Sequence, residues 1–385
     1  MNRLKELITE LCPNGVEYQE LNQISEMKRG TSITKKDIIE GTTPVISGGR
    51  EPAYYCDKYN RDGETITVAG SGAGAGYVQY WDRPIFVCDA FSIQGHEDVN
   101  TKYLYYCLSN KQEYIYSTKK GGGVPHVHIS SIENLKIPVP PLPVQQEIVR
   151  ILDSFTELTA ELTAELTARR KQYEYYRDEL LVEPKDGIEM QFADIFEFQN
   201  GFAFKSALFR ESGHPILRIT NIQEQRIGTE NLVYFSPDNY KENLESFIVY
   251  PGDIIVAMSG ATTGKIGVNN TDKKYYLNQR VGKFRPRENV IHKRYLYHLL
   301  LQNSNKLLEI SLGSGAQPNL SSEKLKKLTA KIPPLFEQKR IANILDKLDA
   351  LCNDLTSGLP AEIEARQKQY EYYRNKLLSF KEKTV

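Results

Sequence analysis

The sequence RRKQYEYYR at residues 169–177 decides the fold, because it returns almost unchanged as RQKQYEYYR at residues 366–374. The two copies lie 197 residues apart, from 169 to 366, in a chain of 385 residues. Self-similarity at a long spacing is typical of a duplicated architecture. The chain is therefore predicted to contain the same structural part twice, one after the other.

A second repeated motif lies upstream of each copy. Its members are Pro140, Pro141, Leu142 and Gln145 in the first copy and Pro333, Pro334, Leu335 and Gln338 in the second. Because proline disfavours helical geometry in the residue before it, the motif predicts the end of one fold and the start of a helix. The predicted divisions are a first globular domain at 1–136, a first helix at 137–182, a second globular domain at 183–332, and a second helix with a C-terminal tail at 333–385.

The segments after these prolines are predicted to be helices of about 40 residues. The first has no glycine or proline from Val144 to Leu181. Its apolar side chains keep heptad spacing with one four-residue shift, and they are Ile148, Ile151, Phe155, Leu158, Leu162, Leu166, Tyr173, Tyr176 and Leu180. The second stripe runs from Ile341 to Leu377 and is interrupted at residues 357–360. Since such long helices need a cover for their apolar stripe, we expect an antiparallel coiled coil about an internal pseudo-twofold axis.

The globular parts combine strands with short helices. The predicted strands are short, rich in β-branched and aromatic residues, and bounded by turn residues; they are 64–68, 77–81, 85–88, 215–219, 253–257 and 274–277. Short helices are expected at 102–111 and 293–308. The expected fold class is α+β, with two tandem mixed α/β domains separated by two long antiparallel coiled-coil helices.

Composition excludes several classes of protein. Forty per cent hydrophobic and 10% aromatic residues exclude a mostly disordered chain. No run of 18 apolar residues predicts a membrane span, and the charged N-terminus does not resemble a signal peptide. The five cysteines are odd in number and never form a CxxC pair, which favours a reducing compartment over a disulfide framework or a zinc site. We expect a cytoplasmic protein.

Each globular part carries a glycine-rich stretch directly after a predicted strand. Residues 70–76, GSGAGAG, resemble a dinucleotide fingerprint, and residues 259–265, SGATTGK, resemble a P-loop. The first is followed by another strand where a helix is required, and the second is one residue short with Ile266 in place of the magnesium-binding hydroxyl. A loop between strands that approaches the backbone of a nucleic acid fits both copies better. The expected DNA contacts here are Ser71, Gly72 and Ser259.

No catalytic motif survives a check of its context. Pro237-Asp238 with residues 272–274 has the letters of a nuclease site, but the first copy has no counterpart and the proline reads as part of a turn. His126 and His128 lack a third metal ligand. The chain also lacks an Asn-Pro-Pro-aromatic motif for methylation of base amino groups and a GxSxG nucleophile elbow. We expect neither catalytic residues nor a bound metal.

Basic residues gather in one stretch although the whole chain has a formal net charge of zero. Residues 261–294 hold nine lysines and arginines against two acidic residues, with aromatic side chains interleaved. This pattern is typical of a face that contacts phosphates. The expected DNA contacts in the second globular part are Lys265, Arg280, Lys283 and Arg285, and those in the first are Lys119 and Lys120.

These features together resemble the DNA-specificity subunit of type I restriction-modification systems. The resemblance rests on GAQPNLS at residues 315–321, on IPPL at residues 332–335 followed by a long helix, and on the doubling of the proline motif and helix. The first copy departs from the pattern, because residues 123–130 read GVPHVHIS.

The resemblance implies two target recognition domains, each reading one half of a split double-stranded DNA site, held apart by paired helices. It also implies that two modification subunits, which bind S-adenosylmethionine and methylate adenine, dock on the helices and that restriction subunits join them. The chain itself would be non-catalytic and hold no cofactor. We expect the eight residues of the repeated proline motif to seat the modification subunits.

Two other classes remain open. A duplicated scaffold or adaptor could bind protein through its coiled coil while its globular parts never meet DNA. A self-contained nuclease or methyltransferase fragment is the enzyme alternative. Net neutrality argues against a strong stand-alone DNA binder, because neutralised phosphates supply most non-specific affinity, although partner subunits could supply the missing charge.

Overall fold

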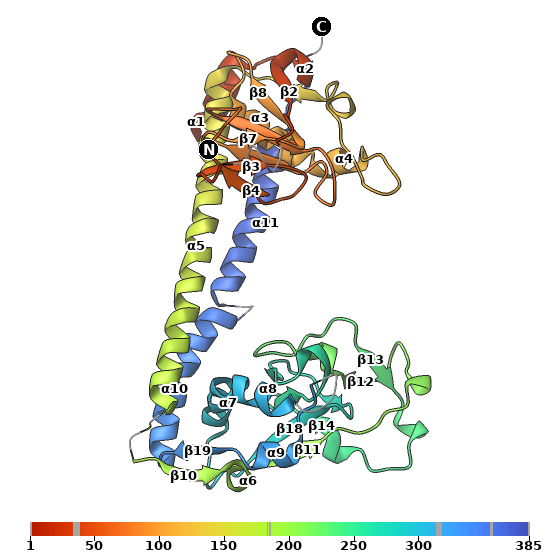
Figure 1. Ribbon diagram of the computed structural model, residues 1–385, viewed down its shortest axis with the longest axis vertical. Coiled ribbons are helices and arrows are strands. Elements are labelled where there is room, and N and C mark those ends of the chain that lie inside the picture. Colours follow the sequence, from red (N-terminus) through yellow and green to blue (C-terminus); the bar gives the residue numbers. More distant parts are fainter. Residues whose placement is uncertain are drawn as a thin grey trace. The chain divides into compact units, whose positions relative to one another are not determined.

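The computed structural model describes residues 2–33, 39–182, 184, 186–312, 318–354 and 357–383. The chain divides into two compact units, which are described separately (Figure 1). Unit 1 comprises residues 1–162 with 363–385, and unit 2 comprises residues 163–362. Residues 315–317 of the expected GAQPNLS motif lie outside the described residues.

The globular part of unit 1 contains two sheets. A four-stranded antiparallel sheet has the order β2-β8-β5-β6, and a three-stranded sheet has the order β4-β3-β7. The strands are β2 (Ser25–Arg29), β3 (Thr43–Ile46), β4 (Tyr54–Cys56), β5 (Thr65–Ala69), β6 (Val78–Trp81), β7 (Phe86–Val87) and β8 (Ala90–Gly95). Helix α3 (Thr101–Asn110) packs against β5, β6 and β8, and α4 (Gln112–Ser117) follows it.

The globular part of unit 2 repeats this plan. Its sheets have the orders β11-β18-β15-β16 and β13-β12-β17-β14. The strands are β11 (Phe196–Asn200), β12 (His214–Leu217), β13 (Val233–Phe235), β14 (Ile248–Val249), β15 (Ile254–Ala257), β16 (Ile266–Val268), β17 (Tyr275–Leu277) and β18 (Val281–Pro286). The helices are α7 (Lys293–Gln302), α8 (Ser304–Ser311) and α9 (Ser322–Lys326), so the single helix expected at 293–308 is in fact two.

The two units also share their smaller elements. A two-stranded sheet pairs β1 (Tyr18–Glu20) with β9 (Lys136–Pro138) in unit 1 and β10 (Ile188–Gln191) with β19 (Thr329–Ile332) in unit 2. A single helical turn follows the first strand of each pair, as α2 (Leu21–Ile24) and α6 (Phe192–Ile195). Helix α1 (Asn2–Leu11) precedes this arrangement in unit 1. The prediction of two tandem mixed α/β parts is confirmed.

Strand β5 in unit 1 and its counterpart β15 in unit 2 are buried along their whole length. The side chains of β15 alternate between two cores. In β15, Ile254 and Val256 join the core that contains α7. Ile255 and Ala257 point the other way, into a core shared with Leu217 of the second sheet. Successive side chains of a strand point to opposite faces, so an unbroken apolar run such as 254–257 fits a strand covered on both sides.

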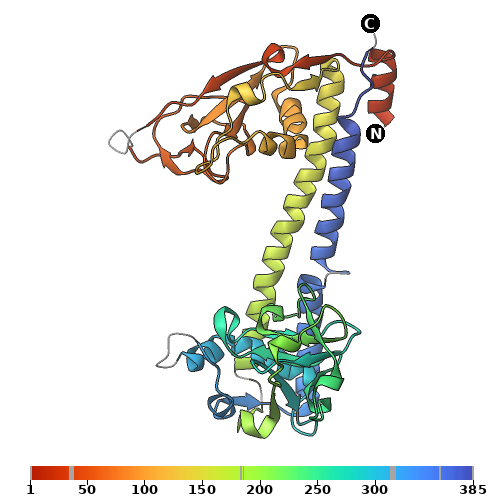
Figure 2. The same cartoon turned by 90° about the vertical axis from the view of Figure 1, so that its right-hand side faces the viewer.

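Helix α5 (Leu142–Val182) is the long helix expected after the first proline motif. In unit 1 its first part lies beside α11 (Leu359–Leu377), as both views show (Figures 1 and 2). The rings of Phe155 and Tyr373 stack there at 5.4 Å. In unit 2 its last part lies beside α10 (Leu335–Asn353). Leu158, Leu162 and Leu166 stay only half-buried, so regular coiled-coil packing remains a prediction.

The second long helix differs from its expected form. Instead of one helix of about 40 residues, the chain forms α10 and α11, each of 19 residues. The physical reason is local, because Pro360 lacks a backbone N–H and restricts Leu359, while Gly358 is a poor helix former. The Ser357 hydroxyl also donates to Asp354 Oδ2 at 2.6 Å, which closes a turn after α10.

Candidate nucleic-acid interface

Both glycine-rich stretches are loops between antiparallel strands and have the same backbone shape. Gly72 and Gly76 have φ angles of 78° and 83°, and Gly260 and Gly264 have the same two values. Side chains with a Cβ atom rarely adopt these angles, which explains the glycines. The first loop leads into β6 and the second into β16. Neither therefore opens the α-helix that a dinucleotide or P-loop site requires.

A second segment pairs with each glycine-rich loop. Ser71 forms an antiparallel β-bridge with His126, and Ser259 forms one with Asn319. The amide of the following residue donates back to the loop in both cases: Val127 N to Gly70 O at 3.0 Å, and Leu320 N to Met258 O at 2.7 Å. We call residues 70–76 with 125–128 the first loop pair, and residues 258–265 with 318–320 the second loop pair.

The first loop pair brings together the DNA contacts expected in the first globular part. Lys120 forms a β-bridge with His126 through two hydrogen bonds of 2.8 and 2.9 Å, and its side chain is exposed. Lys119 next to it lies with its Nζ 4.2 Å from the centre of the Tyr116 ring. Ser71 and Gly72 lie on the other side of the same bridge. These residues form one continuous surface although they are about 50 positions apart in the sequence.

Two further features of the first loop pair were not expected from the sequence. The Ser71 hydroxyl donates a hydrogen bond to the exposed Asp89 carboxylate. The imidazole rings of His126 and His128 stack in parallel at 5.9 Å, with an interplanar angle of 6°. The sequence did not predict an acidic group beside the loop, because the pattern that indicates phosphate contacts consists of basic residues.

The second loop pair carries the opposite charge at the matching place. The carbonyl of Asp89 accepts from Gly70 N at 3.0 Å, and the carbonyl of Arg280 accepts from Met258 N at 2.9 Å. Both residues immediately precede the matching strands β8 and β18. Asp89 and Arg280 are therefore equivalent positions in the duplication, and both side chains are exposed.

The other residues expected to contact DNA in unit 2 differ in how far their side chains are exposed. Lys265 is exposed at the end of the second loop pair, while Ser259 keeps only 5% of its surface exposed. Arg285 is half-buried and its Nη2 donates to Ser246 O at 2.8 Å.

Lys283 requires a correction. Its side chain is 5% exposed, its Nζ donates to the carbonyl of Ile248, and it lies 3.5 Å from the Asp253 carboxylate. Burial lowers the pKa of this amine, and Asp253 opposes that shift. An ammonium group held inside the protein by its own ligands does not reach a DNA phosphate, so Lys283 supports the fold instead.

The repeated glutamines also act inside the protein. Gln145 is fully buried; its Oε1 accepts from Asn100 N at 2.8 Å, and its Nε2 donates to Pro140 O at 2.7 Å and Asp98 O at 3.1 Å. Gln338 makes the same three bonds, to His292 N, Pro333 O and Val290 O, at 2.7–2.9 Å. Each glutamine thus ties the start of a long helix to the residues just before α3 or α7. Direct docking of a partner on these side chains is excluded by their burial.

The remaining residues of the proline motif divide by exposure. Pro140 and Pro333 are buried, whereas Pro141 and Pro334 are exposed and Leu142 and Leu335 are half-buried. Phe336, which follows the second motif, is 72% exposed. A large aromatic side chain in water next to a repeated motif marks a candidate contact surface that the repeat itself could not reveal, because residue 143 of the first copy is a proline.

Residues 13–169 and 184–365 match the model of one protein family, the type I restriction modification DNA specificity domain. The chain belongs to this type I DNA-specificity family. Each matched segment spans one globular part, the proline motif after it and the beginning of the helical segment that follows. The family therefore covers both loop pairs and both proline motifs.

Relatives of this specificity-family chain include a type I restriction enzyme specificity subunit of Haemophilus influenzae. The two are 30% identical over 383 residues, which cover 95% of this chain and 96% of the relative. The specificity subunit of a type I restriction enzyme from Escherichia coli is 37% identical over 295 residues, covering 72% and 70% of the two chains. The crystal structure of a type I S subunit from M. genitalium has a TM-score of 0.66 at 20% identity and covers 94% of this chain and 96% of its own.

Within the described ranges, no group of three or more His, Cys, Asp and Glu side chains is placed to bind a metal ion. Among the same residues, no helix is both long and apolar enough to cross a membrane.

Proposed function

We propose that this chain is the DNA-specificity subunit of a type I restriction-modification system and recognises a bipartite site in double-stranded DNA. The observation that carries the proposal is the pair of equivalent loop pairs, which share a backbone and differ in their exposed side chains. Two similar readers with unlike side chains fit two unlike half-sites at a fixed separation. Membership of the specificity family supports this assignment.

The proposed contacts are the expected residues that lie on the loop pairs or near them, with Lys283 removed. In the first domain they are Ser71, Gly72, Lys119 and Lys120, and in the second Ser259, Lys265, Arg280 and Arg285. Lys120 and Lys265 are assigned to phosphates, because a lysine binds as a mobile point charge. The buried Ser259 contributes through its backbone and by holding Asn319 in place.

The charge difference between the loop pairs is assigned to base recognition. Arg280 is suited to the two acceptors of guanine in the major groove, whereas Asp89 can accept a hydrogen bond from the amino group of cytosine. Ser71 holds the Asp89 carboxylate and so fixes its direction. On this assignment, the same position of the fold reads a different base in each half-site.

The proposed complex contains further subunits. Two modification subunits, which would hold S-adenosylmethionine, dock near the proline motifs, and restriction subunits complete the endonuclease; this chain holds no cofactor and works in the cytoplasm. The exposed Pro141 and Pro334 and the half-buried Leu142 and Leu335 supply the contact surface, together with Phe336. The recognition domains are assigned to residues 1–136 and 183–332, and the spacer segments to 137–182 and 333–385.

A binding assay with and without modification subunits tests this function. We expect the purified chain to bind DNA weakly and to transfer no tritium from S-adenosylmethionine, since its net charge is zero and it lacks catalytic motifs. The assembled complex should retard a duplex that carries the bipartite site. Failure of the complex to bind any DNA would favour a protein-binding scaffold, and methyl transfer by the isolated chain would favour an enzyme.

A further inference from the structure

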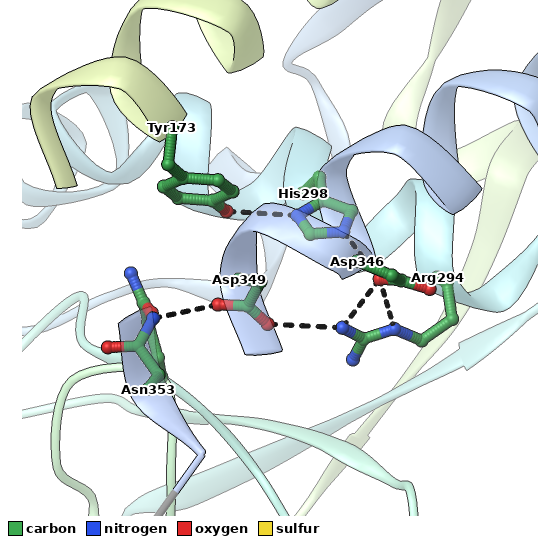
Figure 3. A network of polar contacts seen from close by, with 7 residues as sticks. Tyr173, Arg294, His298, Asp346, Asp349 and Asn353 are labelled. Atoms are coloured by element: carbon green, nitrogen blue, oxygen red, sulfur yellow. Dashed lines mark hydrogen bonds and ion pairs between the residues drawn. The ribbon is translucent and has the colours of Figure 1, made fainter. Parts of the chain in front are cut away.

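A polar network joins three helices of unit 2 (Figure 3). His298 on α7 contacts Tyr173 on α5 through Nδ1 at 2.9 Å and Asp346 on α10 through Nε2 at 2.7 Å. Arg294, one turn earlier on α7, donates to Asp346 at 2.8 Å and to Asp349 at 3.2 Å. Because α7 belongs to the core of the second recognition domain, the network fastens that domain to both long helices.

The network continues from the helices toward the second loop pair. Asn353 donates to Asp349 at 2.9 Å and to the side chain of Gln225. The backbone N–H of Gln225 donates in turn to Ile266 O at 2.8 Å, and Ile266 directly follows Lys265 of the loop pair. Gln225 has a φ of 67°, a conformation uncommon for a residue with a side chain. A continuous set of hydrogen bonds thus connects α10 with the proposed DNA-reading loop.

Unit 1 contains a related network at the equivalent positions, without a histidine. Lys102 pairs with Asp153 at 2.8 Å, and the Tyr106 hydroxyl donates to the same carboxylate at 2.5 Å. These three residues occupy the positions of Arg294, Asp346 and His298 in the repeat. Tyr106 therefore stands where unit 2 has His298. Burial raises the pKa of Tyr106, so its hydroxyl stays neutral at every physiological pH.

His298 can change its charge near neutrality, and its two hydrogen bonds act oppositely on the ring: the bond to Tyr173 favours the neutral form, whereas the bond to Asp346 favours the charged form. A neutral imidazole with its proton on Nε2 donates to Asp346 and accepts from the Tyr173 hydroxyl. Protonation turns Nδ1 into a donor, which leaves the Tyr173 hydrogen without an acceptor in a buried place.

The charged neighbours of His298 have opposite effects on its pKa. Arg294 from its own helix disfavours a second positive charge, whereas Asp346 and Asp349 from α10 favour it. On α5, Arg177 lies over the Tyr173 ring. Tyr173 and Tyr297 are the other titratable groups around the ring. Burial is the largest effect and lowers the pKa of His298. Asp346 keeps 32% of its side chain exposed, and Arg294 and Asp349 of the network line a cleft of about 780 Å³.

We propose that His298, Asp346 and Arg294 form a positioning latch that fixes the second recognition domain on its helices, and that acidification loosens this latch but not its counterpart in unit 1. The inference rests on the proposed function, because the latch matters for DNA only if unit 2 reads a half-site. None of the three is assigned a DNA contact; each acts by holding the reader in place.

The direction of the pH effect follows from proton binding. A histidine whose pKa is lowered in the folded protein binds fewer protons there than when the latch is open. The latch is therefore fully stabilised above the ordinary histidine pKa of about 6.5 and loses stability as the pH falls below it. At pH 5.5, one unit lower, the opening equilibrium should increase by up to about tenfold.

The first experiment measures the latch without DNA. Hydrogen exchange of the full chain, corrected for the intrinsic pH dependence of exchange, is compared at pH 7.5 and 5.5 for the amides of α7 and α3. We expect exchange in α7 to accelerate by up to about tenfold at pH 5.5, while α3 remains unchanged. The His298→Gln variant keeps one donor and one acceptor without titrating, and should remove the acceleration in α7. Equal pH responses of α7 in the wild-type chain and the His298→Gln variant would overturn the proposal.

The reciprocal substitutions use the duplication as an internal control. His298→Tyr places the non-titrating side chain of unit 1 in the unit 2 network and should abolish the pH response of α7. Tyr106→His places a histidine in the unit 1 network and should give α3 a pH response of its own. If Tyr106→His misfolds, the His298→Gln comparison still decides the question.

The second experiment asks whether the latch positions the reader on DNA. The complex with modification subunits is tested against duplexes whose spacer is one base pair shorter, equal or longer than in its methylated sites. We expect the wild-type complex to lose spacer discrimination at pH 5.5 and His298→Gln to keep it. Spacer discrimination that is lost equally in both proteins would contradict a positioning role. Absence of DNA binding at pH 7.5 would instead contradict the proposed function and leave the exchange result standing.

Discussion

The two loop pairs have the same backbone conformation but differ in the exposed side chains beside them. Gly72 and Gly260 share a φ of 78°, and each loop forms one antiparallel β-bridge with a second segment, at His126 and at Asn319. At the equivalent position beside the bridge, however, the first has Asp89 and the second Arg280. The duplication has therefore preserved the residues that shape the loop and exchanged those that face outward.

The comparison separates the residues that fix the shape of each domain from the exposed residues that are proposed to contact DNA. Glycines at left-handed positions and buried glutamines recur because the fold has no substitute for them. Exposed side chains on the same frame are free to differ, since a change there leaves the packing intact. This separation would allow one duplicated fold to recognise two unlike half-sites, as the proposed function requires.

The largest expected effect is the loss of stability on replacing the buried glutamines, and it tests whether these side chains stabilise both units equally. Replacing Gln145 or Gln338 by Leu removes three hydrogen bonds and leaves buried backbone groups unpaired, so each variant should lose roughly 2–4 kcal/mol of unfolding free energy. Gln146→Leu, at the exposed neighbouring position, is the control and should change little. Denaturant unfolding measures all three. A large loss in only one copy would break the equivalence of the units.

Arg280 and Asp89 test whether the readers differ where we expect. Arg280→Ala in the assembled complex should weaken binding by about 1–3 kcal/mol and relax one base position in one half-site. Asp89→Ala should relax a position in the other half-site only. Arg287→Ala, an exposed arginine just beyond β18, serves as the control. Binding to a panel of single-base variants gives the result, and relaxation of both half-sites by either change would refute the assignment.

The lysines sharpen the same comparison through salt dependence. Lys120→Ala and Lys265→Ala should each weaken binding to all sequences alike and lower the slope of log affinity against log salt by about one. Lys283→Ala should leave that slope unchanged and reduce stability, because the amine is buried. A slope lowered by Lys283→Ala and untouched by Lys265→Ala would reverse these roles.

The smallest effect concerns distance. Residues 156–168 read TELTAELTAELTA within α5, a four-residue repeat of Thr or Ala followed by Glu-Leu-Thr, and each four residues add about 6 Å and about 40° of rotation. Deleting residues 159–162 brings Leu166 into the place of Leu162 and should keep the helix. Since DNA rises about 3.4 Å per base pair, the preferred spacer should shorten by about one base pair with both half-sites unchanged. An unaltered spacer would show that the repeat only fills the helix.

The sequence predicted those parts of the molecule that depend on local patterns. The duplication, the strand-to-strand character of both glycine-rich loops and the helix at 142–182 all follow from spacing and composition. The break near Pro360 was visible as an interruption, but its consequence depended on whether the turn at Ser357 closed.

Long-range contacts could not be predicted. Lys283 reads as one more basic residue until the carbonyl of Ile248 and the carboxylate of Asp253 are found around it. Gln145 and Gln338 read as surface residues of a docking motif until the backbone groups they hold are known. The equivalence of Asp89 and Arg280 required the register of β8 and β18, because the two segments share little sequence.

Mapping of methylated sites by the complete complex tests the central claim most directly. The account predicts a two-part motif with unlike halves at one fixed separation, and in Arg280→Ala a motif relaxed at one position of one half only. A single continuous motif, or two halves that change together in Arg280→Ala, would contradict the claim that two copies of one fold read the two halves independently.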